Sequence, residues 1–311
     1  MFVTAAKIVT FQCSQFAVEN ERSPLLPPNH FRYIDSRTDF TIDNPNNART
    51  LYQRYRQFNS NRYNRRKYVN GALYTSLFDD CADIIYPTAG LVIKLDVLLL
   101  NTTERTTITI LYDDNTVQTE LLAMTDMGEA LTSYADNTCR CNHFDGGKMN
   151  VIGSGKKGDG TYGMYNLSNC TEDIKKATMG VTSSVKEYYE GIGLSKEVLE
   201  MNNHRLHGQM DNKKFFNSTI VQSQNLINAA HNDVDDKTIS IATWTEKNVG
   251  TAAHWYFLLP NVTRNGSKGI AIKISNGVTI VWDGRTILHC STVGDIGKGN
   301  NVYGTYFGGK S

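Results

Sequence analysis

The chain has 311 residues, which is enough for one large domain or two ordinary ones, each with a buried core. Its 32 basic and 31 acidic residues nearly cancel, so nucleic acid or a membrane surface would have to be met by a local patch of charge. No apolar run approaches the ~20 residues of a membrane helix, and Lys7 interrupts the apolar N-terminal segment, which makes a poor signal peptide; we therefore expect an intracellular protein, nuclear or cytoplasmic.

The first 90 residues are polar and irregular, and we predict that residues 1–90 form an N-terminal extension of mixed α and β structure. Seven basic residues lie between Arg49 and Lys67, interleaved with four aromatic ones. Guanidinium groups neutralise phosphates, and aromatic rings offer faces on which an unpaired base can stack. The stretch therefore predicts a nucleic-acid contact, and the alternative is a solvated amphipathic helix with tyrosines as core anchors. The residues assigned to the contact are Arg54, Arg56, Arg62, Arg65, Arg66 and Lys67.

The middle of the chain predicts strands and a short helix. Strand-like runs occupy 91–100 and 106–112. The glycine-rich segment 153–163 lacks the spacing of a phosphate-binding loop, so we expect a flexible connection there. Ser184 and Glu187 have the spacing of a capping box, which predicts the start of a helix.

From about residue 215 onward the sequence is a series of short β patterns, such as HWYFLLP, GIAIKI and VTIVW. Asn276–Gly277 and Asp283–Gly284 are dipeptides typical of tight hairpins between such strands. Short strands at this spacing predict a β-sandwich or a jelly roll, and we choose the jelly roll, or double-stranded β-helix. We therefore assign an α+β fold in which residues 91–311 form a cupin-like jelly-roll domain, with its metal-binding core at 215–311.

The segment AHNDVDD, residues 230–236, carries a histidine and three carboxylates ahead of a strand-like run. Residues i and i+2 of a strand share a face, so His231 and Asp233 can project together into a barrel interior. A second histidine from a distant strand would complete a two-histidine, one-carboxylate site, which suits Fe(II) and leaves positions open for a cosubstrate and oxygen. Our choice for that ligand is His289, which lies in a late apolar strand, and the alternative is His254.

These pieces resemble the catalytic core of the TET/JBP family of Fe(II)- and 2-oxoglutarate-dependent dioxygenases, which oxidise the methyl group of 5-methylpyrimidines in nucleic acid. The resemblance lies in AHNDVDDKTISIATWT and GIAIKISNGVTIVWDGRTILHCSTV, within residues 215–311, and is greatest to the divergent branch carried by mobile elements. It implies that His231, Asp233 and His289 are catalytic iron ligands. It also implies 2-oxoglutarate as cosubstrate and a methylated base such as 5-methylcytosine in DNA, or alternatively RNA, as substrate. No obligate protein partner is evident.

One departure from the family concerns the cosubstrate. The family places an arginine one strand beyond the second histidine, where its planar fork holds the distal carboxylate of 2-oxoglutarate. This sequence has no arginine beyond Arg285. On a strand, the even spacing between Arg285 and His289 would put both on one face, and Lys298 is an equal candidate for the charge. Tyr303 or Thr305 would then add a hydroxyl.

Asp236 has two interpretations. It is either a solvated turn acid or a group that binds a water or an unusual cosubstrate. An algal branch of the family uses ascorbate, which is the alternative cosubstrate here.

Two hypotheses of another class remain: a non-catalytic jelly-roll binding module, and a structural protein of a virus or mobile element. Stoichiometric Fe(II) binding would separate the oxygenase from both.

Overall fold

The computed structural model describes residues 32–42, 81–87, 91–98, 104–112, 122, 124–126, 129, 146–156, 162–164, 185–196, 219–227, 232–233, 236–247, 255–260, 262–264, 269–293 and 302–310. The predicted nucleic-acid stretch at 49–67 lies outside the described residues, as do His231, His254 and Lys298. The extension predicted for 1–90 is described only in and around two strands, β1 (Arg32–Ile42) and β2 (Cys81–Ile85).

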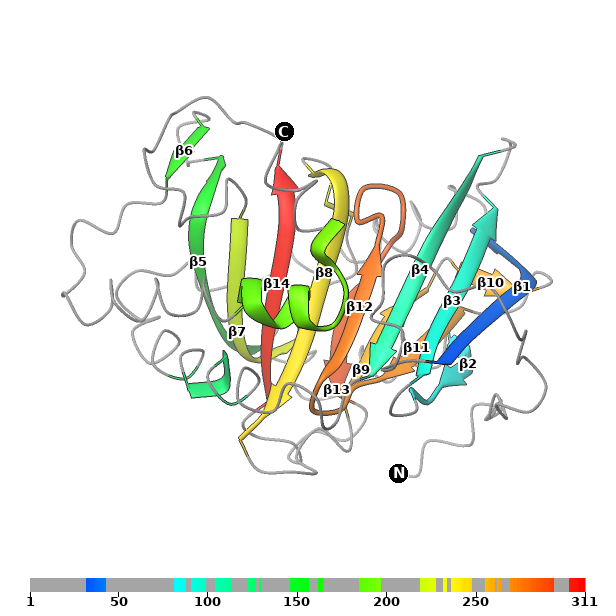
Figure 1. The fold of residues 1–311 in the computed structure, drawn as a ribbon, viewed down its shortest axis with the longest axis horizontal. Helices are drawn as coiled ribbons and strands as arrows, with labels where there is room; N and C mark the ends of the chain where they lie inside the picture. The colour runs from blue at the N-terminus through cyan, green and yellow to red at the C-terminus, as the bar shows by residue number, and fades with distance from the viewer. Residues whose placement is uncertain are drawn as a thin grey trace, which may run out of the picture.

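One large sheet is the main element of the described fold (Figure 1). Its further strands are β3 (Leu91–Leu98), β4 (Arg105–Tyr112), β5 (Gly146–Lys156), β6 (Tyr162–Met164), β7 (Thr219–Ile227), β8 (Asp236–Glu246), β10 (Val262–Arg264), β12 (Val278–Trp282) and β14 (Val302–Lys310). The order is β10-β1-β3-β4-β12-β8-β14-β7-β5-β6. The β1–β3 pair is parallel, and the other described pairs of this sheet are antiparallel.

A smaller sheet lies behind the large one in the view of Figure 1. It contains β2 together with β9 (Trp255–Leu259), β11 (Gly269–Lys273) and β13 (Cys290–Val293), in the order β13-β9-β11-β2. Its β11–β2 pair is parallel, and its other two pairs are antiparallel. Two facing and mostly antiparallel sheets with little helix are consistent with the predicted jelly roll.

Both predicted hairpins are turns, but neither joins two paired strands. The turn at Asn276–Gly277 leads from β11 of the small sheet to β12 of the large one, and residues 283–286 lead back to β13 of the small sheet. Gly277 has a φ of 87°, and Val278 N donates to Ser275 O at 3.0 Å, so the first turn is tight. The hairpin prediction was wrong because a turn dipeptide specifies a chain reversal and not the strand's partner. Each of these two turns carries the chain from one sheet to the other.

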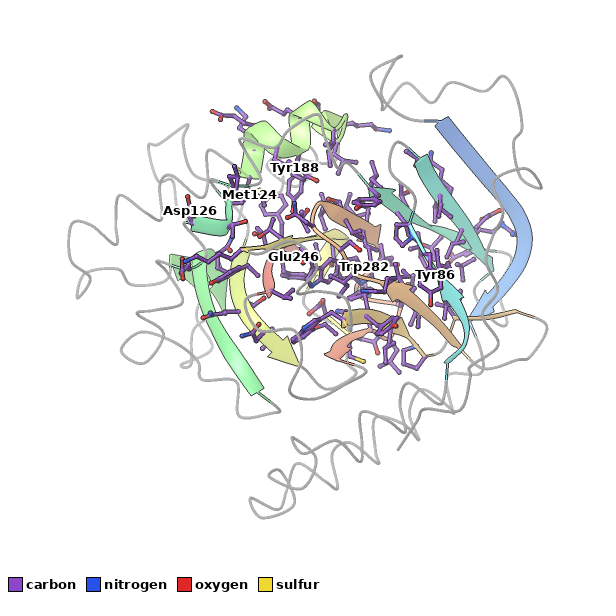
Figure 2. All side chains as sticks on the ribbon, turned by 90° about the horizontal axis from the view of Figure 1, so that it is seen from below. Tyr86, Met124, Asp126, Tyr188, Glu246 and Trp282 are labelled. Carbon is purple, nitrogen blue, oxygen red and sulfur yellow. The ribbon has the colours of Figure 1, made fainter. Side chains whose placement is uncertain are left out.

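The hydrophobic core lies between the two sheets. Alternate residues of the strands point into it, which is the period-2 pattern of half-buried strands. Its members include Ile93, Leu95, Ile108, Ile110, Trp244, Phe257, Ile270, Ile272, Ile280 and Trp282. Trp282 lies in the interior of the molecule, and it is fully buried (Figure 2). Burial of each such side chain contributes roughly 1.5–3 kcal/mol, so this interior layer holds the sheets together.

A short helix at residues 185–191 crosses the outer face of the large sheet in front of β8 and β14 (Figure 1). Its described part starts next to the predicted cap, Ser184. It ends in a Schellman motif, in which Gly193 adopts a φ of 87° and Leu194 N donates to Tyr189 O at 2.7 Å. No helix among the described residues is long and apolar enough to cross a membrane.

Two tyrosines attach this helix to the sheet. The Tyr188 hydroxyl donates to Gly277 O at 3.2 Å and lies 3.1 Å from Thr279 Oγ1 on β12. The Tyr189 ring packs against Phe307 of β14 at a centroid separation of 6.2 Å. The helix therefore covers one face of β8, β12 and β14, while the other face of these strands belongs to the core.

Candidate metal centre

Asp233 and His289 meet although they belong to different sheets. Asp233 lies just before β8 of the large sheet, and His289 lies just before β13 of the small one. Asp233 Oδ2 is 3.2 Å from His289 Nε2. The backbone supports this approach, because Asp233 N donates to Gly284 O at 2.8 Å, in the turn that leads toward His289. Two of the three predicted iron ligands are therefore brought together.

The position of the proton on the His289 ring decides what its Nε2 atom can bind. Nδ1 lies 2.9 Å from Ile287 O, and a carbonyl only accepts, so this contact requires a proton on Nδ1. The indole Nε1 of Trp282 lies 3.3 Å from the same Nδ1 and would require a lone pair there. The two bonds exclude each other. We assign the proton to the shorter contact with Ile287, and the Trp282 ring then meets the imidazole edge-on at a centroid separation of 4.9 Å.

With this tautomer, the lone pair of His289 Nε2 faces the carboxylate of Asp233. Two such groups at 3.2 Å repel each other where their side chains are only 4% and 14% exposed, unless a cation lies with them. A proton or a metal ion meets this need. Metal-binding histidines commonly donate one ring N–H to a carbonyl and bind the metal through the other nitrogen. The donor pair therefore fits the predicted Fe(II) site.

A third side chain joins this pair, and the sequence did not predict it. Tyr306 on β14 donates from its hydroxyl to Asp233 Oδ2 at 2.8 Å. Ser240 on β8 lies 3.1 Å from the same hydroxyl. Because the phenol proton is given to Asp233, Ser240 is the donor in the second bond. Donation therefore runs from Ser240 to Tyr306 and from Tyr306 to Asp233.

Gly284 approaches this cluster from the turn between β12 and β13. A Cβ atom at this position would lie 2.4 Å from Ser240 Oγ and 3.0 Å from Asp233 Oδ2. Any larger residue would push against both side chains. Glycine at position 284 is therefore explained by the close approach of the turn to the polar cluster.

Aromatic rings line the interior beside the imidazole. Phe257 lies 4.9 Å from the ring of Trp282 and 5.7 Å from that of His289, between ring centroids. The Trp282 ring is also 5.9 Å from that of Tyr306. These rings pack against one side of the polar cluster, and the low dielectric there strengthens the attraction of Asp233 and His289 for a cation.

Several predicted site residues cannot be placed relative to this pair. His231, His254 and Lys298 lie outside the described residues, and Asp236 opens β8 with its side chain not described. Within the described part of the chain, no group of three histidine, cysteine or acidic side chains is placed to hold a metal ion. The third iron ligand therefore stays a prediction from the sequence.

Arg285 does not share the face of His289. Residues 283–286 form a turn in which Asp283 Oδ1 accepts from Arg285 N at 3.0 Å and from Thr286 N at 3.3 Å. The Arg285 side chain is exposed, whereas His289 is buried. Strand alternation does not operate across a turn. The geometric basis for Arg285 as a cosubstrate anchor is therefore absent.

Tyr303 and Thr305 lie on the opposite face of β14 from Tyr306, beneath the helix. Thr305 pairs with Thr243 of β8, whose hydroxyl contacts the helix, and it accepts from Gln222 Nε2 at 2.8 Å. Burial raises the pKa of Tyr303 to about 12, so its hydroxyl stays protonated at neutral pH. Their placement does not support the predicted role in holding a 2-oxo acid.

Comparisons with known proteins find distant structural similarity. No family model and no curated protein matches the chain. The chain is similar to the structure of NgTET1 in complex with 5mC DNA, with a TM-score of 0.47 and 10% identity over 68% of this chain and 75% of that one. For a Pseudomonas putida prolyl-4-hydroxylase the TM-score is 0.34, with 7% identity over 66% and 92% of the two chains.

An oxidoreductase of the 2OG-Fe(II) oxygenase family from Burkholderia pseudomallei is also similar, with a TM-score of 0.33 and 12% identity over 64% of this chain and 82% of that one. All three TM-scores are below 0.5 and the identities are 12% or lower. These similarities therefore assign neither a family nor a function.

Proposed function

We propose that the chain is an Fe(II)-dependent dioxygenase that uses 2-oxoglutarate to oxidise a methylated pyrimidine base in nucleic acid, with DNA as the preferred form. The observation that carries the proposal is the 3.2 Å approach of Asp233 Oδ2 to His289 Nε2, with His289 Nδ1 bonded to Ile287 O. It brings an imidazole nitrogen and a carboxylate oxygen to the same space, which supports two of the three ligands that a two-histidine, one-carboxylate iron site needs. His231 is the proposed third ligand.

The residues of the chain hold and shield the metal. When bound, Fe(II) supplies the activation of dioxygen for oxidation of a C–H bond. Asp233 and His289 provide two of its ligands. The bond from His289 Nδ1 to Ile287 O fixes the imidazole orientation and leaves Nε2 as the nitrogen that would bind the metal. Trp282 and Phe257 pack against the imidazole and limit the access of water.

The proposed substrate is supported by the sequence. The segments that carry His231, Asp233 and His289 resemble enzymes that oxidise 5-methylpyrimidines in nucleic acid. The basic and aromatic stretch at 49–67 offers charges for phosphates and rings for an extruded base. Extrusion costs a few kcal/mol, and such a surface would repay part of that cost.

An anaerobic Fe(II) titration tests the metal site. The wild-type chain should bind one ion, and His231→Ala or His289→Ala should abolish binding. His254→Ala is the matched control, because it removes an imidazole that the proposal leaves out of the site, and it should bind like the wild type. A folded wild-type chain that binds no iron would favour a non-catalytic jelly roll.

An activity assay tests the reaction. The iron-loaded protein is incubated with oxygen and a duplex that contains 5-methylcytosine, with 2-oxoglutarate in one arm and ascorbate in another. We expect the oxidised base and succinate in equal amounts in the first arm. Product in the ascorbate arm alone would mean that ascorbate, and not 2-oxoglutarate, is the cosubstrate. Iron binding without an oxidised base in DNA or RNA would refute the proposed nucleic-acid substrate.

A further inference from the structure

We infer that Tyr306 is a positioning residue of the metal centre, whose hydroxyl holds Asp233 Oδ2 in the orientation that meets a metal together with His289. The inference rests on the proposed function. It adds to the site a residue from β14, the last described strand, that neither the H-x-D pattern nor the second histidine indicates.

Asp233 Oδ2 has contacts with both Tyr306 and His289. It accepts the Tyr306 hydroxyl at 2.8 Å. The same oxygen lies 3.2 Å from His289 Nε2. Because Tyr306 bonds to this oxygen, it fixes the rotation of the carboxylate. The backbone bond from Asp233 N to Gly284 O fixes only the position of the main chain. The oriented oxygen is therefore prepared for a metal before one arrives.

The Tyr306 hydroxyl is itself held in place. Ser240 is fully buried and lies 3.1 Å from the hydroxyl as its donor. Both residues lie on the neighbouring strands β8 and β14, so their separation is set by the sheet. The Trp282 ring packs beside that of Tyr306. Donation from Ser240 to Tyr306 polarises the phenol and strengthens its bond to the carboxylate.

A direct bond from Tyr306 to the metal is the competing arrangement. It would need loss of the phenol proton that Asp233 accepts in this structure. The two arrangements differ in an observable way, because a tyrosinate bound to Fe(III) gives a charge-transfer band in the visible spectrum and a hydrogen-bonded phenol does not. The inference therefore predicts no such band after oxidation of the iron-loaded protein.

Tyr306→Phe tests the inference by metal affinity, measured anaerobically with Fe(II) in competition with a chelator. We expect binding about 10- to 100-fold weaker than in the wild type, as for other groups that orient a metal ligand. Tyr188→Phe is the matched control. It also removes a buried tyrosine hydroxyl with two contacts, to Gly277 and Thr279, but on the helix-covered face of the sheet. It should lower thermal stability and leave the affinity unchanged.

Ser240→Ala provides a second variant that keeps the phenol and its packing, should Tyr306→Phe fail to fold. We expect it to weaken Fe(II) binding by about two- to tenfold, the effect of one neutral hydrogen bond. Wild-type affinity in a folded Tyr306→Phe, an equal loss in the Tyr188→Phe control, or a tyrosinate band would each overturn the inference. In those cases the proposed function stands, whereas a folded wild-type chain that binds no Fe(II) overturns both.

Discussion

Replacing Gly284 by alanine tests how the turn between β12 and β13 supports the site. The new Cβ would lie 2.4 Å from Ser240 Oγ and 3.0 Å from Asp233 Oδ2. The first distance is shorter than side-chain contacts allow and the second is tighter than most of them, so a neighbour has to move. Ser240 is fully buried, and its hydroxyl is bonded to Tyr306, which restricts how it can respond.

The structure sets the size of the effect. If Ser240 rotates away, its bond to Tyr306 is lost, which costs about 0.5–1.5 kcal/mol. If the turn shifts instead, overpacking costs about 1–3 kcal/mol. We expect Gly284→Ala to lower the free energy of unfolding by about 1–3 kcal/mol in urea titrations at neutral pH.

A double-mutant cycle with Ser240→Ala checks the cause. Without Oγ, the nearest atoms to the new methyl group are Asp233 Oδ2 at 3.0 Å and the Cβ of residue 240 at 3.3 Å. The cost of Gly284→Ala should then fall below about 1 kcal/mol. An equal cost of Gly284→Ala in both backgrounds would refute the reasoning.

Three further predictions concern the rest of the fold. Gly269→Ala should lower the free energy of unfolding by about 3 kcal/mol or more in thermal unfolding. Its Cβ would lie 2.6 Å from backbone atoms that include Pro260 Cα, and backbone atoms cannot rotate away. An unchanged stability would contradict this packing. Asn276→Ala should cost about 1–2 kcal/mol in urea, because Asn276 Oδ1 accepts from Glu246 N at 3.1 Å, and an unchanged midpoint would contradict this. Burial lowers the pKa of Lys273 from 10.5 to about 8. Between these pH values the unfolded chain binds more protons than the folded one, so the contribution of Lys273 to the free energy of unfolding rises with pH. The unfolding free energy of the wild type minus that of Lys273→Gln should therefore increase from about pH 7.5 to pH 10, and a flat or falling difference would oppose it.

The sequence predicted β3, β4 and most strands from β7 onward because these depend on local patterns, but it did not predict β1 or β5, and it assigned the end of β5 to a flexible connection. The run from Val278 to Trp282 reads as a strand and is one. The pairing of strands depends on contacts between distant segments, and the Asn276–Gly277 and Asp283–Gly284 dipeptides carry no information on it. We predicted Asp233 and His289 as ligands because imidazole and carboxylate are characteristic metal ligands. The structure brings the two side chains together through a long-range fold, and their binding of a metal stays a prediction.

The residues around this pair were harder to predict for two physical reasons. In β14, aromatic and hydroxyl side chains occupy both faces, so alternation alone could not distinguish Tyr306 from Tyr303 and Thr305. Arg285 was placed by strand alternation, but the carboxylate of Asp283 closes a turn at that point. A polar residue beside a metal ligand is recognised only when the register of its strand is known.

Crystals grown with Fe(II) in the absence of oxygen would test the central claim most directly, through an anomalous difference map at the iron absorption edge. We predict one peak within bonding distance of both Asp233 Oδ2 and His289 Nε2, with His289 Nδ1 still on Ile287 O. An empty gap between the two side chains at saturating Fe(II), or a peak bound to neither of them, would contradict the account.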